Sequence, residues 1–109
     1  MDLTDKKCIP CHGGLPALKK KNAEIFLKKV DDWALSNDAT KITKQFKFKN
    51  FVEAMKFVNK VAEIAEQEAH HPDILINWNK VTLELTTHAI KGLHENDFIL
   101  AAKIDIYNT

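Results

Sequence analysis

Apolar and polar residues alternate along three stretches of the chain, 42–48, 74–78 and 81–85. A period of two is typical of strands that place one face on a core. On the first stretch the apolar side holds Ile42, Phe46 and Phe48. Lys44 interrupts that side, so we expect it near an edge of the sheet. The last two stretches follow one another closely, which indicates a tight connection or a bulged bend. A further, shorter strand is expected to start at Trp33.

Three other stretches repeat apolar residues at steps of three and four, the period of an amphipathic helix. The first covers 18–31, with lysines on its outer side. The second starts at the cap Asn50, with Glu53 at the capping-box position, and runs to about His70, where a proline follows closely. The third covers 95–107, and its residues available for the core are Phe98, Ala101, Ala102 and Ile106.

The predicted order is helix, two strands, helix, two strands, helix. Strand pairs separated by helices favour an α+β fold, with a four-stranded antiparallel sheet and three helices packed on one face. With 109 residues, the whole chain 1–109 is expected to form a single domain. Residues 1–17 are rich in proline and glycine, which predicts an irregular N-terminal arm that lies on this domain.

The second predicted helix is apolar over much of its circumference. Beside its main stripe, a further set of apolar residues widens the surface: Val52, Phe57, Val61 and Ile64. A helix with such a broad apolar surface is often covered on two sides. Two interpretations therefore stay open, one with the sheet on one side and a second subunit on the other, and one with a single broad core face.

The charges of the chain are nearly balanced, with a formal net charge of +1 at pH 7. All 16 basic residues are lysine, and the chain has no arginine, the usual bidentate partner of phosphate and guanine. We therefore expect no nucleic-acid partner. No apolar run is long enough to span a membrane, and residues 1–7 lack the apolar segment of a signal peptide. We expect no membrane association and a cytoplasmic location.

The arm contains the pattern C-x-x-C-H at Cys8, Cys11 and His12, which is the pattern of covalent haem attachment. Haem attachment would need export of the chain and an axial partner. The same three side chains could also bind zinc, but no second pair of ligands is obvious. A structural arm is the favoured interpretation.

Two adjacent histidines, His70 and His71, stand where the second helix is expected to end. Histidine can give and take protons near neutral pH, because its ordinary pKa is closest to 7. Glu66 lies four residues before His70, on the same helical face, so its carboxylate could orient that imidazole. Asp73 adds another carboxylate nearby. The alternative is a solvated helix end that happens to carry two histidines.

Two further elements could converge on this helix end. Trp78 would offer a flat wall for a ring-shaped ligand, and Thr87 and His88 stand at the end of the last strand. Three histidines from separate elements would suit acid–base chemistry. A zinc site built from His70, His71 and His88 is a competing possibility.

Several of these residues occur in a spacing that resembles the signature of the pterin-4a-carbinolamine dehydratase family. The matching pattern is Glu66-x-x-x-His70-His71-Pro72, followed by Trp78, His88 and Asp97. The arm adds the pattern Cys8-x-Pro10-Cys11-x-Gly13-Gly14, which is seen in bacterial members. The likeness covers nearly the whole chain.

The resemblance implies the removal of water from a 4a-hydroxytetrahydropterin, the spent cofactor of aromatic amino acid hydroxylases. The pterin would be the substrate, and the reaction would need no metal and no other cofactor. His70 and His88 would act as acids on opposite faces of the ring, while His71 would bind substrate and assist deprotonation of N5. Glu66, with Asp73, Trp78 and Thr87, would support them. We also expect a homodimer or homotetramer.

Two departures from the family pattern stand out. Ala69 replaces an acidic residue that many members carry before the histidine pair, so that carboxylate is missing or is supplied by Glu68 or Asp73. His94 stands where a serine or threonine often caps the last helix, which predicts a weaker cap. A competing function is an oligomeric protein-binding module, because animal members also act as dimerisation cofactors for a transcription factor, and a role in another pterin pathway also stays open.

Overall fold

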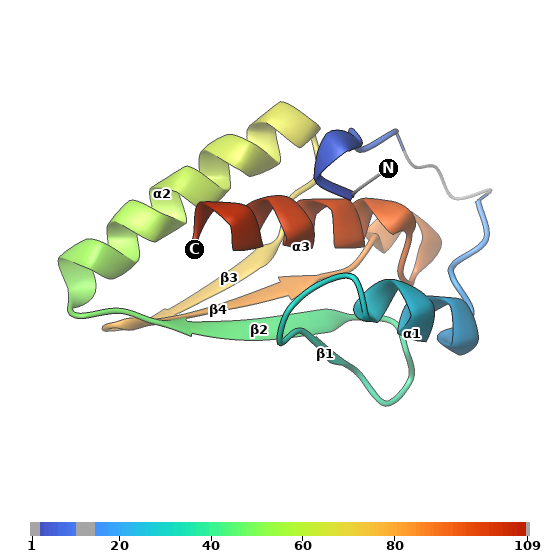
Figure 1. Cartoon of the computed structure of the whole chain (residues 1–109), viewed down its shortest axis with the longest axis horizontal. Coiled ribbons are helices and arrows are strands. Elements are labelled where there is room, and N and C mark those ends of the chain that lie inside the picture. Colours follow the sequence, from blue (N-terminus) through green and yellow to red (C-terminus); the bar gives the residue numbers. More distant parts are fainter. Residues whose placement is uncertain (1–2, 11–14, 109) are drawn as a thin grey trace.

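Four antiparallel strands form one sheet, in agreement with the predicted α+β class (Figure 1). The structure is a computed structural model that describes residues 3–10 and 15–108. The strands are β1 (Ala34–Leu35), β2 (Ile42–Lys47), β3 (Asp73–Asn77) and β4 (Lys80–Leu85). Their order across the sheet is β1-β2-β4-β3, so β3 is an edge strand and β4 lies inside the sheet.

Three α-helices accompany the sheet, and two of them lie across one of its faces (Figure 1). They are α1 (Lys20–Leu27), α2 (Phe51–Glu68) and α3 (Glu95–Tyr107), together with the short 3-10 helices η1 (Leu3–Asp5) and η2 (His88–Ile90). The long helices α2 and α3 cover the sheet, while α1 packs near β1 and the start of α3. In the described part of the chain, no helix is long and apolar enough to cross a membrane.

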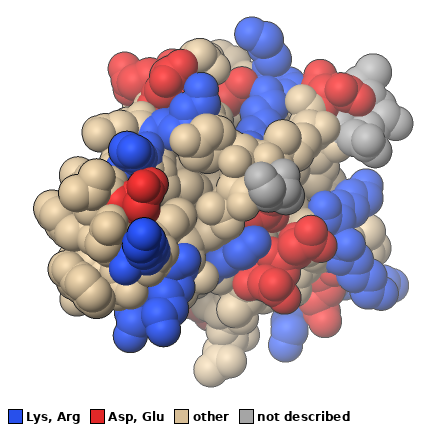
Figure 2. Space-filling view, turned by 60° about the vertical axis from the view of Figure 1, so that its left-hand side comes forward, with Lys and Arg blue, Asp and Glu red and all other residues tan. Residues whose placement is uncertain are grey.

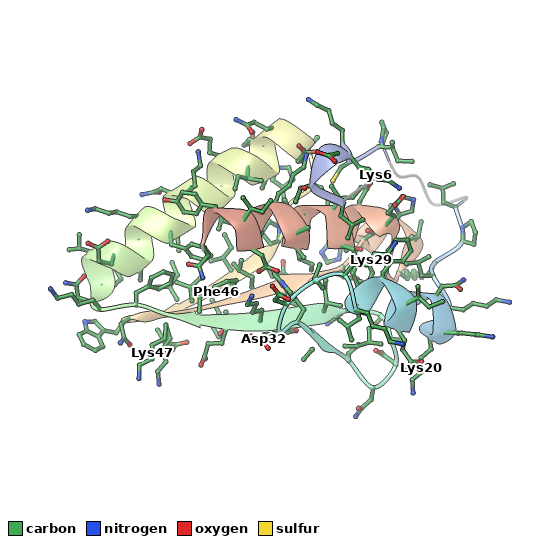
Figure 3. All side chains as sticks on the ribbon, viewed as in Figure 1. Lys6, Lys20, Lys29, Asp32, Phe46 and Lys47 are labelled. Carbon is green, nitrogen blue, oxygen red and sulfur yellow. The ribbon has the colours of Figure 1, made fainter. Side chains whose placement is uncertain are left out.

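The alternation along β2 sorts its side chains as predicted. Phe46 is 3% exposed and its ring lies 4.7 Å from that of Phe57 of α2, between centroids. Lys47, the next residue, points away from the helices (Figure 3). Burial of such aromatic side chains supplies much of the apolar area removed from water. Of the core residues expected on α3, Ile106 is 59% exposed instead, although the next residue, Tyr107, still stacks on Phe57 of α2.

Lys44 shows that an interrupted apolar face can signal a buried ion pair. Its strand is an inner one, but β1 pairs only with Ile42 and Thr43, so Lys44 stands just beyond that paired stretch. Its Nζ lies 2.8 Å from Oδ1 of Asp105 on α3, and both side chains are less than 15% exposed. Asp105 also accepts a hydrogen bond from Nε1 of Trp33. The expected edge position is therefore only partly correct.

Helix α2 starts as predicted and ends two residues earlier than expected. The Asn50 side chain accepts a hydrogen bond from the Glu53 backbone N–H, at 2.9 Å. At the other end, Ala69 adopts a left-handed conformation with φ 52° and ψ 38°. A left-handed residue at this position is a common way to end a helix. It turns the chain before the histidines, so they lie outside the helix.

The hairpin between β3 and β4 closes through a two-residue turn, Trp78 and Asn79, which confirms the tight connection. Trp78 has a φ of 47° and a side chain that is 66% exposed. The Asn79 amide donates to the backbone carbonyl of Phe48, at 3.0 Å, and so ties the turn to the residue that follows β2. Figure 2 shows lysines and acidic residues interspersed on the face at this end of the molecule, with uncharged surface between them.

Candidate active site

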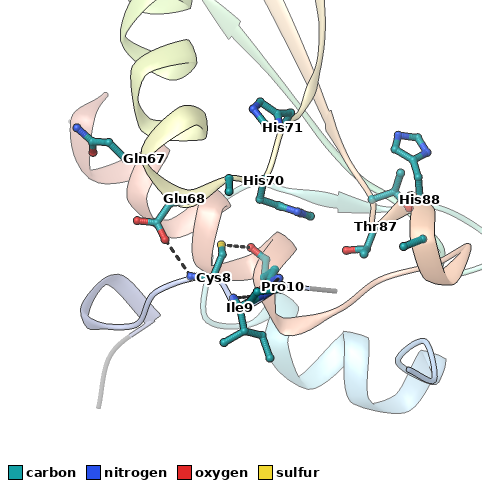
Figure 4. A pocket seen from close by; sticks show the side chains of 13 residues that line it. Cys8, Ile9, Pro10, Gln67, Glu68, His70, His71, Thr87 and His88 are labelled. Carbon is teal, nitrogen blue, oxygen red and sulfur yellow. Dashed lines mark hydrogen bonds between the residues drawn. The ribbon is translucent and has the colours of Figure 1, made fainter. Parts of the chain in front are cut away.

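A pocket of about 550 Å³ opens where the N-terminal arm, the end of α2 and the segment after β4 meet (Figure 4). Its volume lies in the range of small-molecule sites. The lining residues include three from the arm, five around the end of α2 and four after β4: Cys8, Ile9, Pro10, Gln67, Glu68, Ala69, His70, His71, Thr86, Thr87, His88 and Ala89. Asn96 of α3 completes the lining.

His70 is turned inward by the reversal at Ala69. Its Nε2 lies 2.6 Å from Oδ1 of Asp97, and the His70 side chain is only 12% exposed. Asp97 is fully buried. Because an ionised carboxylate can only accept hydrogen bonds, Nε2 of His70 donates to it, and Nδ1 is left as the nitrogen that can serve a ligand.

Asp97 is the centre of a small hydrogen-bond network. Its Oδ2 accepts from the Thr87 hydroxyl at 2.8 Å and from the backbone N–H of His94 at 3.0 Å. The His94 ring in turn accepts from the backbone N–H of Asn96, so His94 caps α3 with its side chain. These contacts fix the carboxylate, and the carboxylate fixes the His70 ring.

His71 lies in a different environment from its neighbour. Its Nε2 is 2.5 Å from Oε2 of Glu66, and the two side chains are 60% and 76% exposed. The prediction that Glu66 orients His70 is therefore wrong. The chain leaves the helix at Ala69, so His70 is not on the helical face of Glu66, and His71 is the histidine that reaches back to it.

His88 and Thr87 reach the pocket from the end of β4. Thr87 is buried and bridges to Gly92 through backbone hydrogen bonds in both directions. A Cβ added at Gly92 would lie 2.7 Å from Cβ of Ala17, so only glycine fits there without a shift. His88 begins η2 and is exposed at the pocket rim. All three histidines and Thr87 thus line one pocket.

Two of the expected site residues are not brought to this pocket. Trp78 is in the turn at the far end of β3, and Asp73 is an exposed residue at the start of that strand. A strand advances about 3.3 Å per residue, so the length of β3 carries Trp78 well away from His71. Within one chain, Trp78 cannot form the wall of this pocket.

Glu68 holds the arm rather than replacing the acidic residue that is absent at Ala69. Its Oε1 accepts from the backbone N–H of Cys8 at 2.9 Å, and its Oε2 lies 2.7 Å from Nζ of Lys103. Burial raises the pKa of Glu68, but the bonds from Lys103 and Cys8 outweigh burial and lower the pKa below its usual value.

The Cys8 thiol is held in its neutral form. Burial first, and then the charge of Glu68, raise its pKa to about 12. A thiol with so high a pKa is a poor nucleophile at neutral pH. Cys11 and His12, the other members of the proposed haem or zinc pattern, lie outside the described residues. Among the residues that are described, no three His, Cys, Asp or Glu side chains are arranged to hold a metal ion.

Sequence reasoning missed four contributors to this site: Asp97 as the partner of His70, Asn96, Glu68 as a clamp, and the arm segment Cys8–Pro10. Asp97 belongs to the recurring spacing noted above, and its place three residues after the cap His94 could have suggested a buried carboxylate. No pattern in the sequence joins the arm to α3, because their contacts span almost the whole chain.

Comparison with known proteins places the chain among close relatives. A family model described as pterin 4 alpha carbinolamine dehydratase matches residues 16–107. A curated relative from Halorhodospira halophila is 52% identical over 105 residues, which cover 96% of both chains. Another from Methylococcus capsulatus is 52% identical over 103 residues, which cover 94% of this chain and 90% of the relative. Both bear the name "Putative pterin-4-alpha-carbinolamine dehydratase".

Two solved structures share the fold. One, described as a transcriptional coactivator/pterin dehydratase from Brucella melitensis, has a TM-score of 0.78 and 32% identity, and the match covers 83% of this chain and 96% of that chain. The other, described as a pterin dehydratase-like protein that is a RuBisCO assembly factor in the alpha-carboxysome, has a TM-score of 0.60 and 22% identity, with 69% and 87% covered. The second likeness concerns the fold alone.

Proposed function

This chain belongs to the pterin-4-alpha-carbinolamine dehydratase family, and we propose that it catalyses the dehydration of a 4a-hydroxytetrahydropterin to a quinonoid dihydropterin and water. In this reaction the bond between C4a and the hydroxyl oxygen breaks. The proton on N5 leaves, a double bond forms between C4a and N5, and the hydroxyl departs as water after it gains a proton. Such an elimination needs a proton donor at the hydroxyl and a base near N5.

His70 is the proposed acid on one face of the pterin ring. Its Nε2 is engaged by Asp97, so Nδ1 is the atom that would give a proton to the leaving hydroxyl. A fixed ring orientation lowers the entropy that must be lost on the way to the transition state. His88, on the separate element η2, is the proposed acid for the opposite face.

His71 is proposed to bind the substrate and to assist the loss of the N5 proton, with Glu66 as its supporting carboxylate. The observation that carries the proposal is the meeting of all three histidines in one pocket, with one of them fixed by a buried carboxylate. A binding module without catalysis would have no use for this network. Cofactor recycling for an aromatic amino acid hydroxylase in the cytoplasm is the matching physiological role.

A rate measurement tests the proposal. Freshly made 4a-hydroxytetrahydropterin is mixed in a stopped-flow instrument with the folded protein, purified in the presence of a chelator. We expect the absorbance of the quinonoid product to rise faster than in buffer, because acid or base catalysis alone is worth about 100- to 10,000-fold. A rate equal to that of buffer at micromolar protein would rule out the dehydratase and favour the protein-binding alternative.

We further propose that the chain forms a homodimer or homotetramer. Among the described residues, none pairs with the outer side of the edge strand β3, and its Leu75 is 58% exposed. On α2, Phe51 and Val52 are 48% and 61% exposed. Apolar surface and an open sheet edge of this kind mark sites of association.

A further inference from the structure

The N-terminal arm is held at the pocket by a buried amide. Asn96 is 2% exposed, its Oδ1 accepts from the backbone N–H of Ile9 at 3.0 Å, and its Nδ2 donates to the Ile9 carbonyl at 2.6 Å. Both backbone groups of one residue are thus paired with a single side chain, much as a neighbouring strand would pair them. The position of Ile9 is therefore set by α3.

The neighbouring residues strengthen this attachment. The backbone N–H of Cys8 donates to Glu68, and the Cys8 sulfur lies 3.5 Å from the backbone carbonyl of Asn96. Lys6 forms an ion pair with Glu95 at 2.6 Å. Glu68 lies two residues before His70, and Asn96 directly precedes Asp97. The arm is consequently tied to the end of α2 and the start of α3, which also hold the His70–Asp97 pair.

The side chains of the arm lie at the pocket and not in the core. Ile9 is 56% exposed and Pro10 is also exposed, although the backbone is fixed, and both line the pocket. In Figure 4, His70 lies between the arm and His71. An apolar side chain held in place but left open gains its burial only when a ligand covers it.

We propose that Ile9 and Pro10 form the specificity-determining wall of the pocket, which contacts the substituent that a pterin carries at C6, and that Asn96 is the residue that positions this wall. The inference rests on the proposed function, since it assumes that a pterin ring occupies the space beside the histidines. The hydrogen-bonding ring would contact the histidines, and the carbon atoms of the C6 substituent would lie against the arm.

Binding of two stable pterins tests the wall. The probes are 7,8-dihydropterin, which has no substituent at C6, and 7,8-dihydrobiopterin, which carries a dihydroxypropyl group there. Neither has a 4a-hydroxyl, so neither is consumed. Dissociation constants are measured by calorimetry for the full chain and for Ile9→Ala, with Ile25→Ala on α1 as the matched control, because Ile25 is similarly exposed at 52% and lies outside the pocket.

Ile9→Ala is expected to weaken 7,8-dihydrobiopterin by about threefold or more and to leave 7,8-dihydropterin unchanged. This loss is smaller than the roughly 10- to 200-fold effect of one methylene in a closed apolar pocket, because the Ile9 side chain lies on an open wall. Asn96→Leu, which keeps the volume but removes both bonds to Ile9, should give the same selective loss. The control Ile25→Ala should change neither constant.

Each other outcome has a definite meaning. If both pterins bind the unchanged protein and their ratio is the same in Ile9→Ala, the wall is refuted while the proposed function stands. If neither pterin binds the unchanged protein, the proposed function fails and the wall falls with it. A shift in Ile9→Ala without one in folded Asn96→Leu would overturn only the positioning role of Asn96. If Asn96→Leu does not fold, Ile9→Ala decides alone.

Discussion

At the scale of single residues, two adjacent histidines occupy opposite environments. His70 is nearly buried against Asp97, whereas His71 is mostly exposed beside Glu66. The difference arises from Ala69, whose left-handed conformation sends the first ring inward and lets the second point outward. The left-handed conformation brings the alanine Cβ close to the following carbonyl oxygen and costs roughly 1–2 kcal/mol. The two rings can therefore take different roles in the same reaction.

The first prediction concerns the faces of the pterin ring. One side chain cannot reach a hydroxyl on either face of a planar ring, so His70→Ala should slow one 4a-hydroxy epimer by about 100- to 10,000-fold and largely spare the other. His88→Ala should do the reverse. His71→Ala should raise KM more than it lowers kcat, since it removes a binding contact that the ground state and the transition state share. Stopped-flow kinetics on the separated epimers provide the measurement, and equal losses for both epimers would contradict the two-acid scheme.

The second prediction concerns Asp97, which we place as a positioning residue that acts through His70. Asp97→Asn should lower kcat by about 100-fold for the epimer that depends on His70, because an amide cannot accept from His70 and Thr87 as the carboxylate does. The double variant with His70→Ala should then be no slower than His70→Ala alone. Additive losses in this cycle, or an equal loss for the other epimer, would show that Asp97 acts by a different route.

At the scale of elements, the arm depends on the charge of Glu68. The pKa of this carboxyl is lowered in the folded protein, so its stabilising contribution is present above its ordinary value of 4.5 and is lost as the pH falls through the lower folded value. The arm should therefore loosen in acid, while the sheet and its helices depend on other contacts.

The third prediction follows from this dependence. Glu68→Gln keeps an acceptor for Cys8 but removes the charge beside Lys103, so above pH 5 it should lower the free energy of unfolding by about 2 kcal/mol. The gap between the two proteins should close as the pH falls below 4.5. Urea unfolding between pH 3 and 7 measures it. Glu63→Gln is the control, because Glu63 is 58% exposed. A stability difference between the unchanged protein and Glu68→Gln that stays constant down to pH 3 would argue against a role for the Glu68 charge.

Local patterns predicted the elements well and their long-range partners poorly. The alternation at Ile42 and Phe46 and the cap at Asn50 are local signals, and each is confirmed. Helix α2 ends before the position that the nearby proline predicts, because Ala69 adopts a left-handed conformation, which an alanine in the sequence does not signal. The pairs Lys44–Asp105 and His70–Asp97 join residues far apart in the chain, so no spacing rule could find them.

At the scale of the whole molecule, exposed apolar residues on β3 and α2 lead to the fourth prediction. Sedimentation velocity should detect a dimer or tetramer at micromolar concentration, because an isolated domain would leave these residues in water. Leu75→Lys on β3 or Val52→Lys on α2 should shift the protein toward smaller species. Ile25→Lys on α1 serves as the control, with similar exposure to Leu75. A monomer at high concentration would refute the proposed assembly.

The strand order has a kinetic consequence as well. The β3–β4 hairpin is closed by a two-residue turn, whereas β2 reaches β4 across residues 48–79, a loop about four doublings longer. Each doubling adds roughly 0.6 kcal/mol of closure entropy, so bringing β2 to β4 costs roughly 2.4 kcal/mol more than closing the hairpin. We expect the hairpin to form early and the arrival of β2 to limit the folding rate. Refolding and unfolding rates of Phe46→Ala should thus give a φ-value well above zero, and a φ-value near zero would place the arrival of β2 after the rate-limiting step.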